Sequence, residues 1–230
     1  MSAFKLVIFD FDDTLLDDTA STHAGLRALM ERHDLHHVSL TEFHARHQQI
    51  IDDLSPRLFA GEIDGNQARV LRFGQLMTDY GAQEADGHAA NELYRAAYKA
   101  AWQLCNGAKE VLSHLKGEGY RLALLSNYVR EVQMEKVGRF GLASEFDGLF
   151  FTEDVPAPKP DSRAFLSVCE RLGVVTEQAV MVGDSLKNDV EGALRAGLKA
   201  VWYNRWQTVG PAVPTIRHLR ELPALLRTFA

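Results

Sequence analysis

The sequence predicts an α/β protein built on a doubly wound, Rossmann-like parallel sheet with an inserted all-helical cap subdomain. Short apolar runs of strand length alternate with segments of helical periodicity over most of the 230 residues. The runs are almost continuously apolar, which is typical of strands that helices cover on both faces. Residues 19–102 contain no convincing strand, so we expect a sheet domain from residues 1–18 and 103–230, with the cap between them.

Five apolar runs with β-branched or aromatic content are predicted as strands, and a short sixth strand is expected after the turn PAVP near the C-terminus. In chain order the five runs are FKLVIF (4–9), RLALLS (121–126), GLFFT (148–152), AVMVG (179–183) and KAVWY (199–203).

Helical periodicity marks the segments between these strands and the whole of the cap. Around the sheet the predicted helices are AKEVLSHLKGEG (108–119), DSRAFLSVCERLGV (161–174), LKNDVEGALRAG (186–197) and RHLRELPALLRT (217–228). In the cap they are HAGLRALMERH (23–33), LTEFHARHQQIIDDL (40–54), QARVLRFGQLMTDYG (67–81) and ELYRAAYKAAWQL (92–104). Glycines at 119, 173 and 197 are expected to end three of the sheet-domain helices in a left-handed conformation.

Composition excludes several classes of partner. A formal net charge of -6 gives no long-range attraction for nucleic acid polymers or anionic membranes. Asp10 interrupts the early apolar run, so no export signal is predicted, and no stretch approaches the roughly 20 apolar residues of a membrane span. We therefore expect a cytoplasmic protein, and the sequence leaves open whether it is a monomer or a homodimer.

Polar side chains follow four of the predicted strands directly or in the next loop. They are Asp10 and Asp12, then Ser126 and Asn127, then Lys159, and finally Asp184 and Asp189. Because the carboxyl ends of neighbouring parallel strands line one crevice, these residues are expected to meet at a single site. Several carboxylates around one lysine suit an oxygen-preferring divalent ion together with a phosphate, and Mg²⁺ fits better than Zn²⁺ because no histidine or cysteine follows these strands.

The spacing of Asp10 and Asp12 suggests a reaction. One carboxylate can attack a phosphoryl group to give an acyl phosphate. A second acid two residues away can protonate the leaving oxygen and later deprotonate water. The pattern therefore indicates hydrolysis of a phosphate ester.

The motifs FDFDDTL, LLSN, PKPD and VGDSLKND resemble, in their order and at their strand ends, those of the haloacid dehalogenase-like hydrolase superfamily. The insertion after the first motif is similar to the class with a helical cap, which includes phosphoglycolate phosphatases, N-acylneuraminate-9-phosphatases and pyrimidine 5′-nucleotidases. The resemblance implies a magnesium-dependent phosphatase that acts on a small phosphorylated metabolite.

The resemblance also implies roles for individual residues. Asp10 is expected to be the nucleophile, Asp12 the general acid/base, and Lys159 the cation that steadies the nucleophile and the phosphate. The expected phosphate-binding group is Ser126 with the amide of Asn127, and Thr14 supports the first loop. The expected magnesium ligands are Asp10, the backbone carbonyl of Asp12, and Asp184, with Asp189 orienting metal-bound water or the lysine.

Two other functions remain open at this stage. A 2-haloacid dehalogenase would use the same nucleophile, but breaking a carbon–halogen bond needs no acid such as Asp12. A phosphoaspartate signalling module would be labelled without turnover, but such modules are about half this length and lack a long helical insertion.

Each motif taken alone has a plainer interpretation as a turn or helix cap. The paired histidines of the cap, His36 with His37 and His44 with His47, are interpreted as solvated surface residues. Arg72 resembles an arginine that nucleotidase relatives tend to keep, but a surface or salt-bridged arginine is an equal alternative. The substrate stays open among nucleotides, sugar phosphates and phosphoglycolate.

Overall fold

The computed structural model describes residues 4–81 and 86–229. Two compact units make up the chain: a sheet unit, formed by residues up to Asp17 and from Leu104 onward, and a helical unit, Asp18–Gln103. The helical unit extends one residue beyond each end of the 19–102 interval predicted as the cap. No helix among the described residues combines the length and apolar character needed to cross a membrane.

The sheet confirms the predicted α/β class. Within the described residues it has six strands, all paired in parallel, in the order β3-β2-β1-β4-β5-β6. Their bounds are β1 Leu6–Phe9, β2 Arg121–Leu125, β3 Gly148–Phe150, β4 Ala179–Gly183, β5 Lys199–Tyr203 and β6 Thr215–Ile216. All six lie inside the predicted runs or just after the predicted turn, and the order is that of a Rossmann-like sheet.

The register of the sheet brings the polar residues to one edge. Phe9, the last residue of β1, pairs with Leu124 on one side and Val182 on the other. The residues that follow these three strands therefore emerge next to one another at the carboxyl edge. The strand order reverses beside β1, and the crevice outside such a reversal is where open α/β sheets bind ligands.

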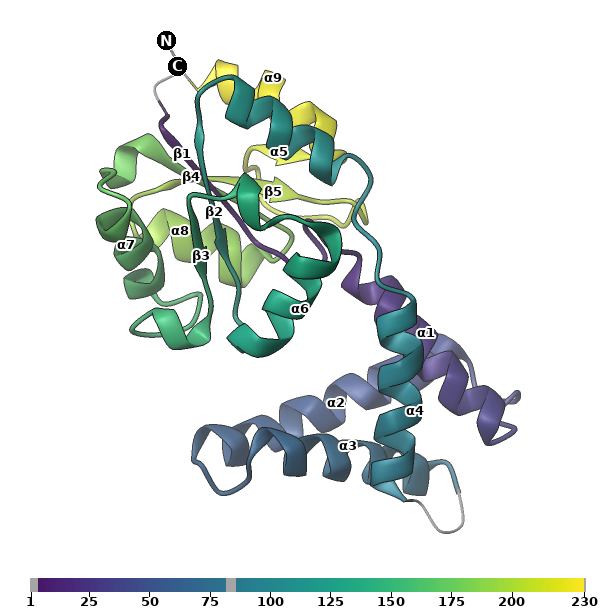
Figure 1. The fold of residues 1–230 in the computed structure, drawn as a ribbon. Coiled ribbons are helices and arrows are strands. Elements are labelled where there is room, and N and C mark those ends of the chain that lie inside the picture. The colour runs from purple at the N-terminus through teal and green to yellow at the C-terminus, as the bar shows by residue number, and fades with distance from the viewer. Residues whose placement is uncertain (1–3, 82–85, 230) are drawn as a thin grey trace. The chain divides into compact units, whose positions relative to one another are not determined.

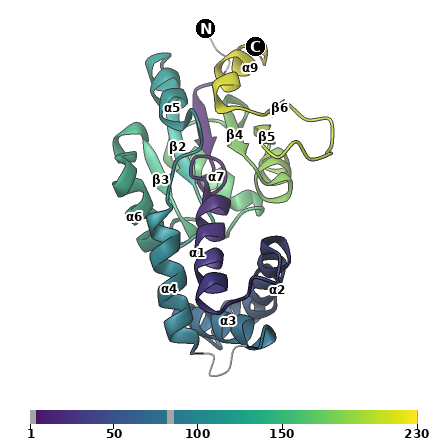
Figure 2. The same ribbon diagram turned by 90° about the vertical axis from the view of Figure 1, so that its right-hand side faces the viewer.

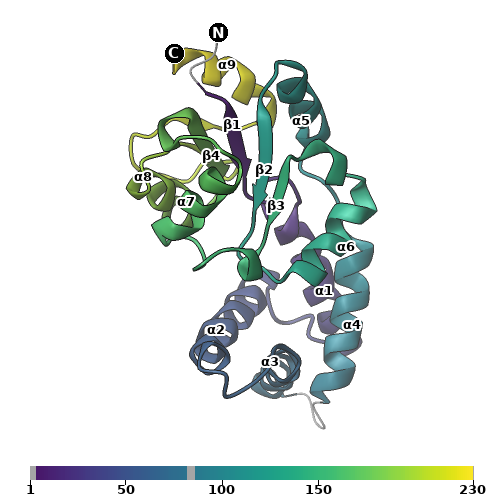
Figure 3. The same cartoon turned by 60° about the vertical axis from the view of Figure 1, so that its left-hand side comes forward.

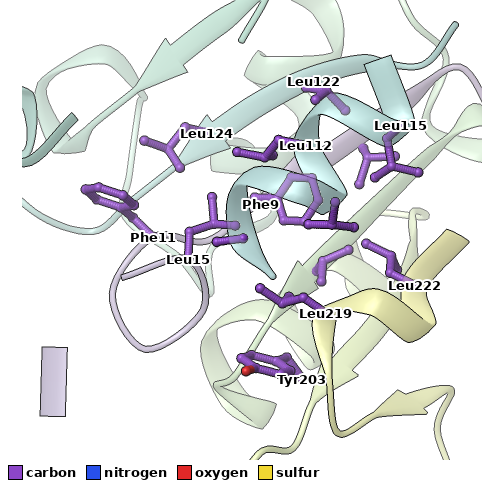
Figure 4. Packing of buried hydrophobic residues seen from close by; sticks show 14 of the residues in the cluster. Phe9, Phe11, Leu15, Leu112, Leu115, Leu122, Leu124, Tyr203, Leu219 and Leu222 are labelled. Carbon is purple, nitrogen blue, oxygen red and sulfur yellow. The ribbon is translucent and has the colours of Figure 1, made fainter. Parts of the chain in front are cut away.

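Helices cover both faces of the sheet, which explains why the strands are apolar throughout (Figures 1 and 3). Alternate residues of β1 point to opposite faces: Phe9 packs in one apolar cluster and Ile8 in the other. The helices are α5 Ala108–Gly117, α6 Arg130–Phe140 and α9 Leu222–Thr228 on one face, and α7 Ser162–Arg171 and α8 Gly192–Arg195 on the other. Figure 4 shows Leu112 of α5 and Leu222 of α9 gathered around Phe9.

Several helical elements differ from their predicted form. Helix α6 was not among the predicted helices, although the parallel pairing of β2 with β3 requires a crossover between them. The segment predicted as one helix over residues 186–197 begins with a π-helical turn, Leu186–Glu191, before α8. The remaining short elements are 3₁₀ turns at Ala143–Glu145, Thr152–Asp154, Thr176–Gln178 and Leu219–Glu221.

The helical unit contains four described helices, as predicted for this interval. They are α1 Asp18–Arg32, α2 Leu40–Phe59, α3 Gly65–Asp79 and α4 Gly87–Ala100. Helix α4 begins five residues before the predicted Glu92 because the Asp86 carboxylate caps it, accepting a hydrogen bond from the backbone N–H of His88 over 2.8 Å. Figure 2 shows α1 and α4 side by side, and an apolar cluster joins these helices to α2 and α3.

Two glycines allow the helices of this unit to approach closely. A Cβ at Gly25 in α1 would lie 2.5 Å from the ring of Tyr94 in α4. A Cβ at Gly87 would lie 2.3 Å from the backbone oxygen of Val70 in α3. Larger side chains at these positions would force the helices apart.

The interpretation of His47 as a solvated residue is wrong. Its side chain is buried against Phe73, with ring centroids 5.6 Å apart, and against Tyr94. Among the described residues neither ring nitrogen has a hydrogen-bond partner. Burial, reinforced by the charge of Arg72, lowers the pKa of His47 to about 3, so this imidazole is neutral near pH 7. The helical spacing of His44 and His47 gave no indication of which side of α2 faces the core.

Candidate active site

The loop that follows β1 wraps around a single carbonyl oxygen. The backbone N–H groups of Thr14, Leu15 and Leu16 all donate to the Phe11 carbonyl. Asp13 adopts a left-handed conformation with φ of 60°, which aspartate tolerates better than most side chains. This tight turn directs Asp10 and Asp12 toward the carboxyl edge of the sheet.

Asp10 forms a buried ion pair. Lys159 Nζ donates to Asp10 Oδ1 and to Asp189 Oδ1, each over 2.6 Å, and all three side chains are almost fully buried. Burial lowers the pKa of the Lys159 ammonium, but the charges of Asp10 and Asp189 outweigh it and hold that pKa above its usual value. The lysine therefore stays protonated between the two carboxylates.

The carboxylates near Lys159 are buried with too few positive charges beside them. Burial raises the pKa of Asp10 well above its usual value. The charges of Asp189 and Asp184 raise it further, and Lys159 opposes this effect. Burial, with the charges of Asp189 and Asp13, raises the pKa of Asp184 to about 7. One lysine does not balance three carboxylates, so the cluster favours a further cation or a proton.

Oxygen atoms of Asp10, Asp184 and Asp189 all lie within 4.8 Å of one another. This donor set consists only of carboxylates, which suits a hard divalent cation such as Mg²⁺. Asp189 is the least free of the three, because its two oxygens already accept hydrogen bonds from Lys159 and from the backbone N–H of Ser185. The arrangement fits a cation between Asp10 and Asp184, with Asp189 holding the lysine.

Thr14 supports Asp184 from a fully buried position. Its hydroxyl donates to Asp184 Oδ1 over 3.3 Å and accepts from the Asp184 backbone N–H over 3.1 Å. The Trp202 indole donates to the Asp184 carbonyl over 2.8 Å. The Thr14 hydroxyl therefore links the first loop to both the side chain and the backbone of Asp184.

Gly183 makes room for Asp189. A Cβ at Gly183 would lie 2.2 Å from the Asp189 carboxylate, far inside van der Waals contact. The π-helical turn that carries Asp189 is a local widening of the kind often found at functional sites. Strand β4 must therefore end in glycine for this acid to reach Lys159.

Asn127 fixes the loop that carries Lys159. Its side-chain amide donates to the Lys159 carbonyl over 2.6 Å, and its Oδ1 accepts from the Lys159 backbone N–H over 2.8 Å. Ser126 is buried beside it at the end of β2. These two residues and Lys159 come together as predicted from the strand ends.

Asp12 has partners that the sequence reasoning missed. Lys136 Nζ donates to Asp12 Oδ1 over 2.7 Å, and Gln133 Nε2 donates to Asp12 Oδ2 over 2.6 Å and to Ser126 Oγ over 2.7 Å. Both partners come from α6, and both are buried. The available signal was a glutamine and a lysine three residues apart in a segment that must cross over between parallel strands.

A second missed residue is Arg205, in the loop after β5. Its guanidinium pairs with Asp13 and, over 2.9 Å, with Asp17. Asp17 is the last residue before α1, which begins at Asp18. Arg205 therefore ties the end of the first loop to the sheet unit.

The site thus holds a lysine-bound carboxylate, a second carboxylate two residues away with its own lysine, and a buried hydroxyl. This set of groups is chemically suited to bind an anion, to attack it with one carboxylate and to transfer protons with the other.

Arg72, on α3 of the helical unit, lies over the Phe73 ring with 4.5 Å between its Cζ and the ring centroid.

Comparison with known proteins identifies the family. A family model described as haloacid dehalogenase-like hydrolase matches residues 4–197. The chain is 32% identical to the putative HAD-hydrolase YfnB of Bacillus subtilis over 98% of this chain and 97% of the relative. It is 28% identical to human N-acylneuraminate-9-phosphatase, covering 100% of this chain and 96% of the relative.

Two solved structures superpose on this chain over nearly its whole length. A crystal structure of YfnB bound to magnesium superposes with a TM-score of 0.76 at 30% identity, covering 97% of this chain and 98% of that chain. A 2-haloacid dehalogenase from Pseudomonas syringae gives a TM-score of 0.64 at 25% identity, covering 99% of this chain and 100% of that chain.

Proposed function

The chain belongs to the haloacid dehalogenase-like hydrolases, and from that premise we propose that it is a magnesium-dependent phosphatase of small phosphomonoesters that works through an aspartyl-phosphate. One observation carries the proposal: Asp10 is paired with Lys159, and Asp12 lies two residues away with separate partners. A nucleophile and an independently held acid/base are what phosphate ester hydrolysis requires.

In the first step the Asp10 carboxylate attacks the phosphorus atom. A bond forms between Asp10 and phosphorus, and the bond from phosphorus to the ester oxygen breaks. Asp12, protonated at this stage, gives its proton to the departing oxygen, so the alcohol leaves neutral. Lys159 and the hydroxyl of Ser126 stabilise the charge on the phosphoryl oxygens.

In the second step Asp12, now ionised, takes a proton from a water molecule as its oxygen attacks phosphorus. The bond between phosphorus and Asp10 breaks, which releases inorganic phosphate and restores the Asp10 carboxylate. Asp12 ends this step protonated, ready for the next substrate. Its side chain is 29% exposed, compared with 11% for that of Asp10, which is consistent with contact between Asp12 and water.

The carboxylate cluster supports the choice of Mg²⁺. Asp10 and Asp184 would hold the ion with the backbone carbonyl of Asp12, and Asp189 would orient Lys159. When bound, the ion supplies positive charge that neutralises the phosphate and lowers the raised pKa values of Asp10 and Asp184. The structure of YfnB bound to magnesium supports the same choice.

We extend the proposal to the surroundings of the site. The substrate would be a small phosphorylated metabolite. The enzyme would act in the cytoplasm as a monomer or homodimer. Phosphatase relatives such as N-acylneuraminate-9-phosphatase support a phosphorylated substrate, although they do not choose among nucleotides, sugar phosphates and phosphoglycolate.

The test is release of inorganic phosphate from p-nitrophenyl phosphate and from a panel of phosphorylated metabolites, with Mg²⁺ and with excess EDTA. We expect multiple turnovers with Mg²⁺ and none with EDTA. A parallel assay of the same protein measures halide release from 2-chloropropionate. Halide release without phosphate release would replace the phosphatase proposal with a dehalogenase, and a single stable labelling without turnover would favour a signalling role.

A further inference from the structure

Among the described residues, each oxygen of the Asp12 carboxylate accepts a hydrogen bond from a side chain of α6. Lys136 Nζ lies 2.7 Å from Oδ1, and Gln133 Nε2 lies 2.6 Å from Oδ2. The two residues are three apart in the helix, which places them on one face. A carboxylate held at both oxygens cannot rotate without breaking one of the two hydrogen bonds.

Both donors are removed from water. Gln133 is fully buried and the Lys136 side chain is 2% exposed. Burying an ammonium group costs several kcal/mol unless a charged partner offsets it, and Asp12 is such a partner. The Lys136 ammonium also lies 5.8 Å from the centroid of the Tyr128 ring. An enclosed lysine aimed at Asp12 is therefore held in place rather than sampling solvent.

Gln133 also connects Asp12 to the phosphate-binding hydroxyl. Its side-chain nitrogen donates to Ser126 Oγ over 2.7 Å as well as to Asp12. The nitrogen end of the amide faces Asp12, because Nε2 is the donor in both contacts. One amide group thus sets the distance between the acid/base and the hydroxyl at the end of β2.

We propose that Gln133 and Lys136 are positioning residues that hold the Asp12 carboxyl group where it protonates the leaving oxygen. This inference rests on the proposed phosphatase function. Asp10 has a separate donor, because Lys159 Nζ lies 2.6 Å from its Oδ1. Loss of Gln133 or Lys136 should therefore impair proton transfer and leave nucleophilic attack in place.

The consequence depends on the leaving group. An alkoxide is a poor leaving group and needs the proton from Asp12, whereas p-nitrophenolate departs without one. Because kcat/KM covers the steps up to departure of the leaving group, it reports on this proton transfer. A displaced Asp12 should lower kcat/KM for an alkyl phosphate much more than for p-nitrophenyl phosphate.

The experiment measures kcat/KM with Mg²⁺ for β-glycerol phosphate and p-nitrophenyl phosphate in the wild type and in three variants. Gln133→Met and Lys136→Met remove the donors with little change in volume, and Lys136→Arg restores a charged donor. The matched control is Lys109→Met, which removes an exposed lysine from α5. Circular dichroism and thermal unfolding identify the folded variants.

We expect Gln133→Met and Lys136→Met to lose at least about 10-fold more kcat/KM on the alkyl ester than on the aryl ester, within the range of general acid catalysis. Lys136→Arg should recover part of that selectivity, and Lys109→Met should match the wild type. If Lys136→Met does not fold, Gln133→Met decides the question on its own. Equal losses on both esters, or none, would overturn the inference while the phosphatase stands. If the wild type does not hydrolyse β-glycerol phosphate, the alkyl phosphate of the metabolite panel with the highest turnover replaces it. A wild type that hydrolyses neither p-nitrophenyl phosphate nor any member of the panel would overturn the proposed function and this inference together.

Discussion

Two lysine–aspartate pairs lie at the carboxyl edge of the sheet, and they differ in what surrounds them. Lys159 and Asp10 are joined over 2.6 Å, with Asp189 and Asp184 adding two more carboxylates nearby. Lys136 and Asp12 are joined over 2.7 Å, and the neutral side chain of Gln133 also donates to Asp12. The first pair therefore has more carboxylates than cations around it, whereas the second pair matches one carboxylate with one ammonium group.

This difference separates the two tasks that the site would perform. Excess negative charge around Asp10 favours a bound cation, and Asp10 and Asp184 would hold it where its charge offsets that of a phosphate. A balanced and partly exposed Asp12 needs no cation and can exchange protons with the leaving group and with water. The comparison therefore predicts that variants at the first pair change metal dependence as well as turnover, whereas variants at the second change proton transfer.

The largest effect is expected for Asp10→Asn. Replacing the attacking oxygen of the nucleophile should lower kcat on p-nitrophenyl phosphate by at least about 10³-fold. The protein should remain folded, because the neutral amide relieves repulsion with Asp189 and Asp184. Phosphate release and thermal unfolding, measured on the same preparation, check both statements, and wild-type turnover would remove the mechanism.

Asp12→Asn should have the next largest effect. Loss of the acid/base should lower turnover by roughly 10²–10⁴-fold, because neither leaving-group protonation nor activation of water has a substitute. Turnover should stall at or before the aspartyl-phosphate. Dependence of stability on Mg²⁺ should stay as in the wild type, and its loss would show that the two pairs are not independent.

Asp184→Asn should affect metal and pH dependence together. The pKa of Asp184 is raised to about 7 in the folded, metal-free protein, above its usual value of 3.8. The folded state therefore binds the proton more tightly, and the free energy of unfolding is lost as pH rises from about 4 through about 7. For the metal-free wild type this loss should be on the order of 4 kcal/mol, at about 1.4 kcal/mol for each unit of the pKa difference, and Asp184→Asn should reduce it.

Chemical denaturation at several pH values, with EDTA or with Mg²⁺, measures this effect. Mg²⁺ should raise the midpoint of the wild type, because an ion that binds only the folded state stabilises it. Mg²⁺ should raise the denaturation midpoint of the Asp184→Asn protein by less. An equal gain in both proteins would place the cation elsewhere.

An effect on stability of opposite sign is expected at His47 in the helical unit. Its pKa is lowered to about 3, below the usual 6.5, so the unfolded chain takes up the proton first as pH falls. His47 should therefore reduce stability below pH 6.5, by at most about 1.4 kcal/mol per pH unit. Denaturation of His47→Leu should show a shallower acid loss, whereas the exposed control His37→Leu should follow the wild type. Parallel curves for His47→Leu and the wild type would contradict the buried, neutral state.

The parts of the site that the sequence predicted share one physical basis. Asp10, Ser126 and Asp184 follow continuous apolar strands, and the parallel geometry of the sheet forces such positions together. Lys159 was predicted from a loop motif and the family resemblance, and the structure places it within hydrogen-bonding distance of Asp10. Local sequence patterns were sufficient wherever the backbone alone decided the position.

The parts that were missed depend on which side of a helix faces the site. Gln133 and Lys136 are polar residues on the buried face of α6, so the helix has no clean apolar stripe, and the segment was not predicted as a helix. His47 was misjudged for the complementary reason, because a polar residue in a polar segment packs inward against Phe73. Burial of polar side chains is set by tertiary contacts that a sequence pattern does not display.

The central claim is that Asp10 forms the covalent intermediate while Asp12, held separately, moves the protons. The most direct measurement is peptide mapping by mass spectrometry after acid quenching of Asp12→Asn with p-nitrophenyl phosphate and Mg²⁺. Borohydride reduction converts any acyl phosphate to a stable product. The account predicts that Asp10 is modified in this variant and that Asp10→Asn shows no modification. Modification at another residue, or turnover of Asp10→Asn without any acyl phosphate, would contradict it.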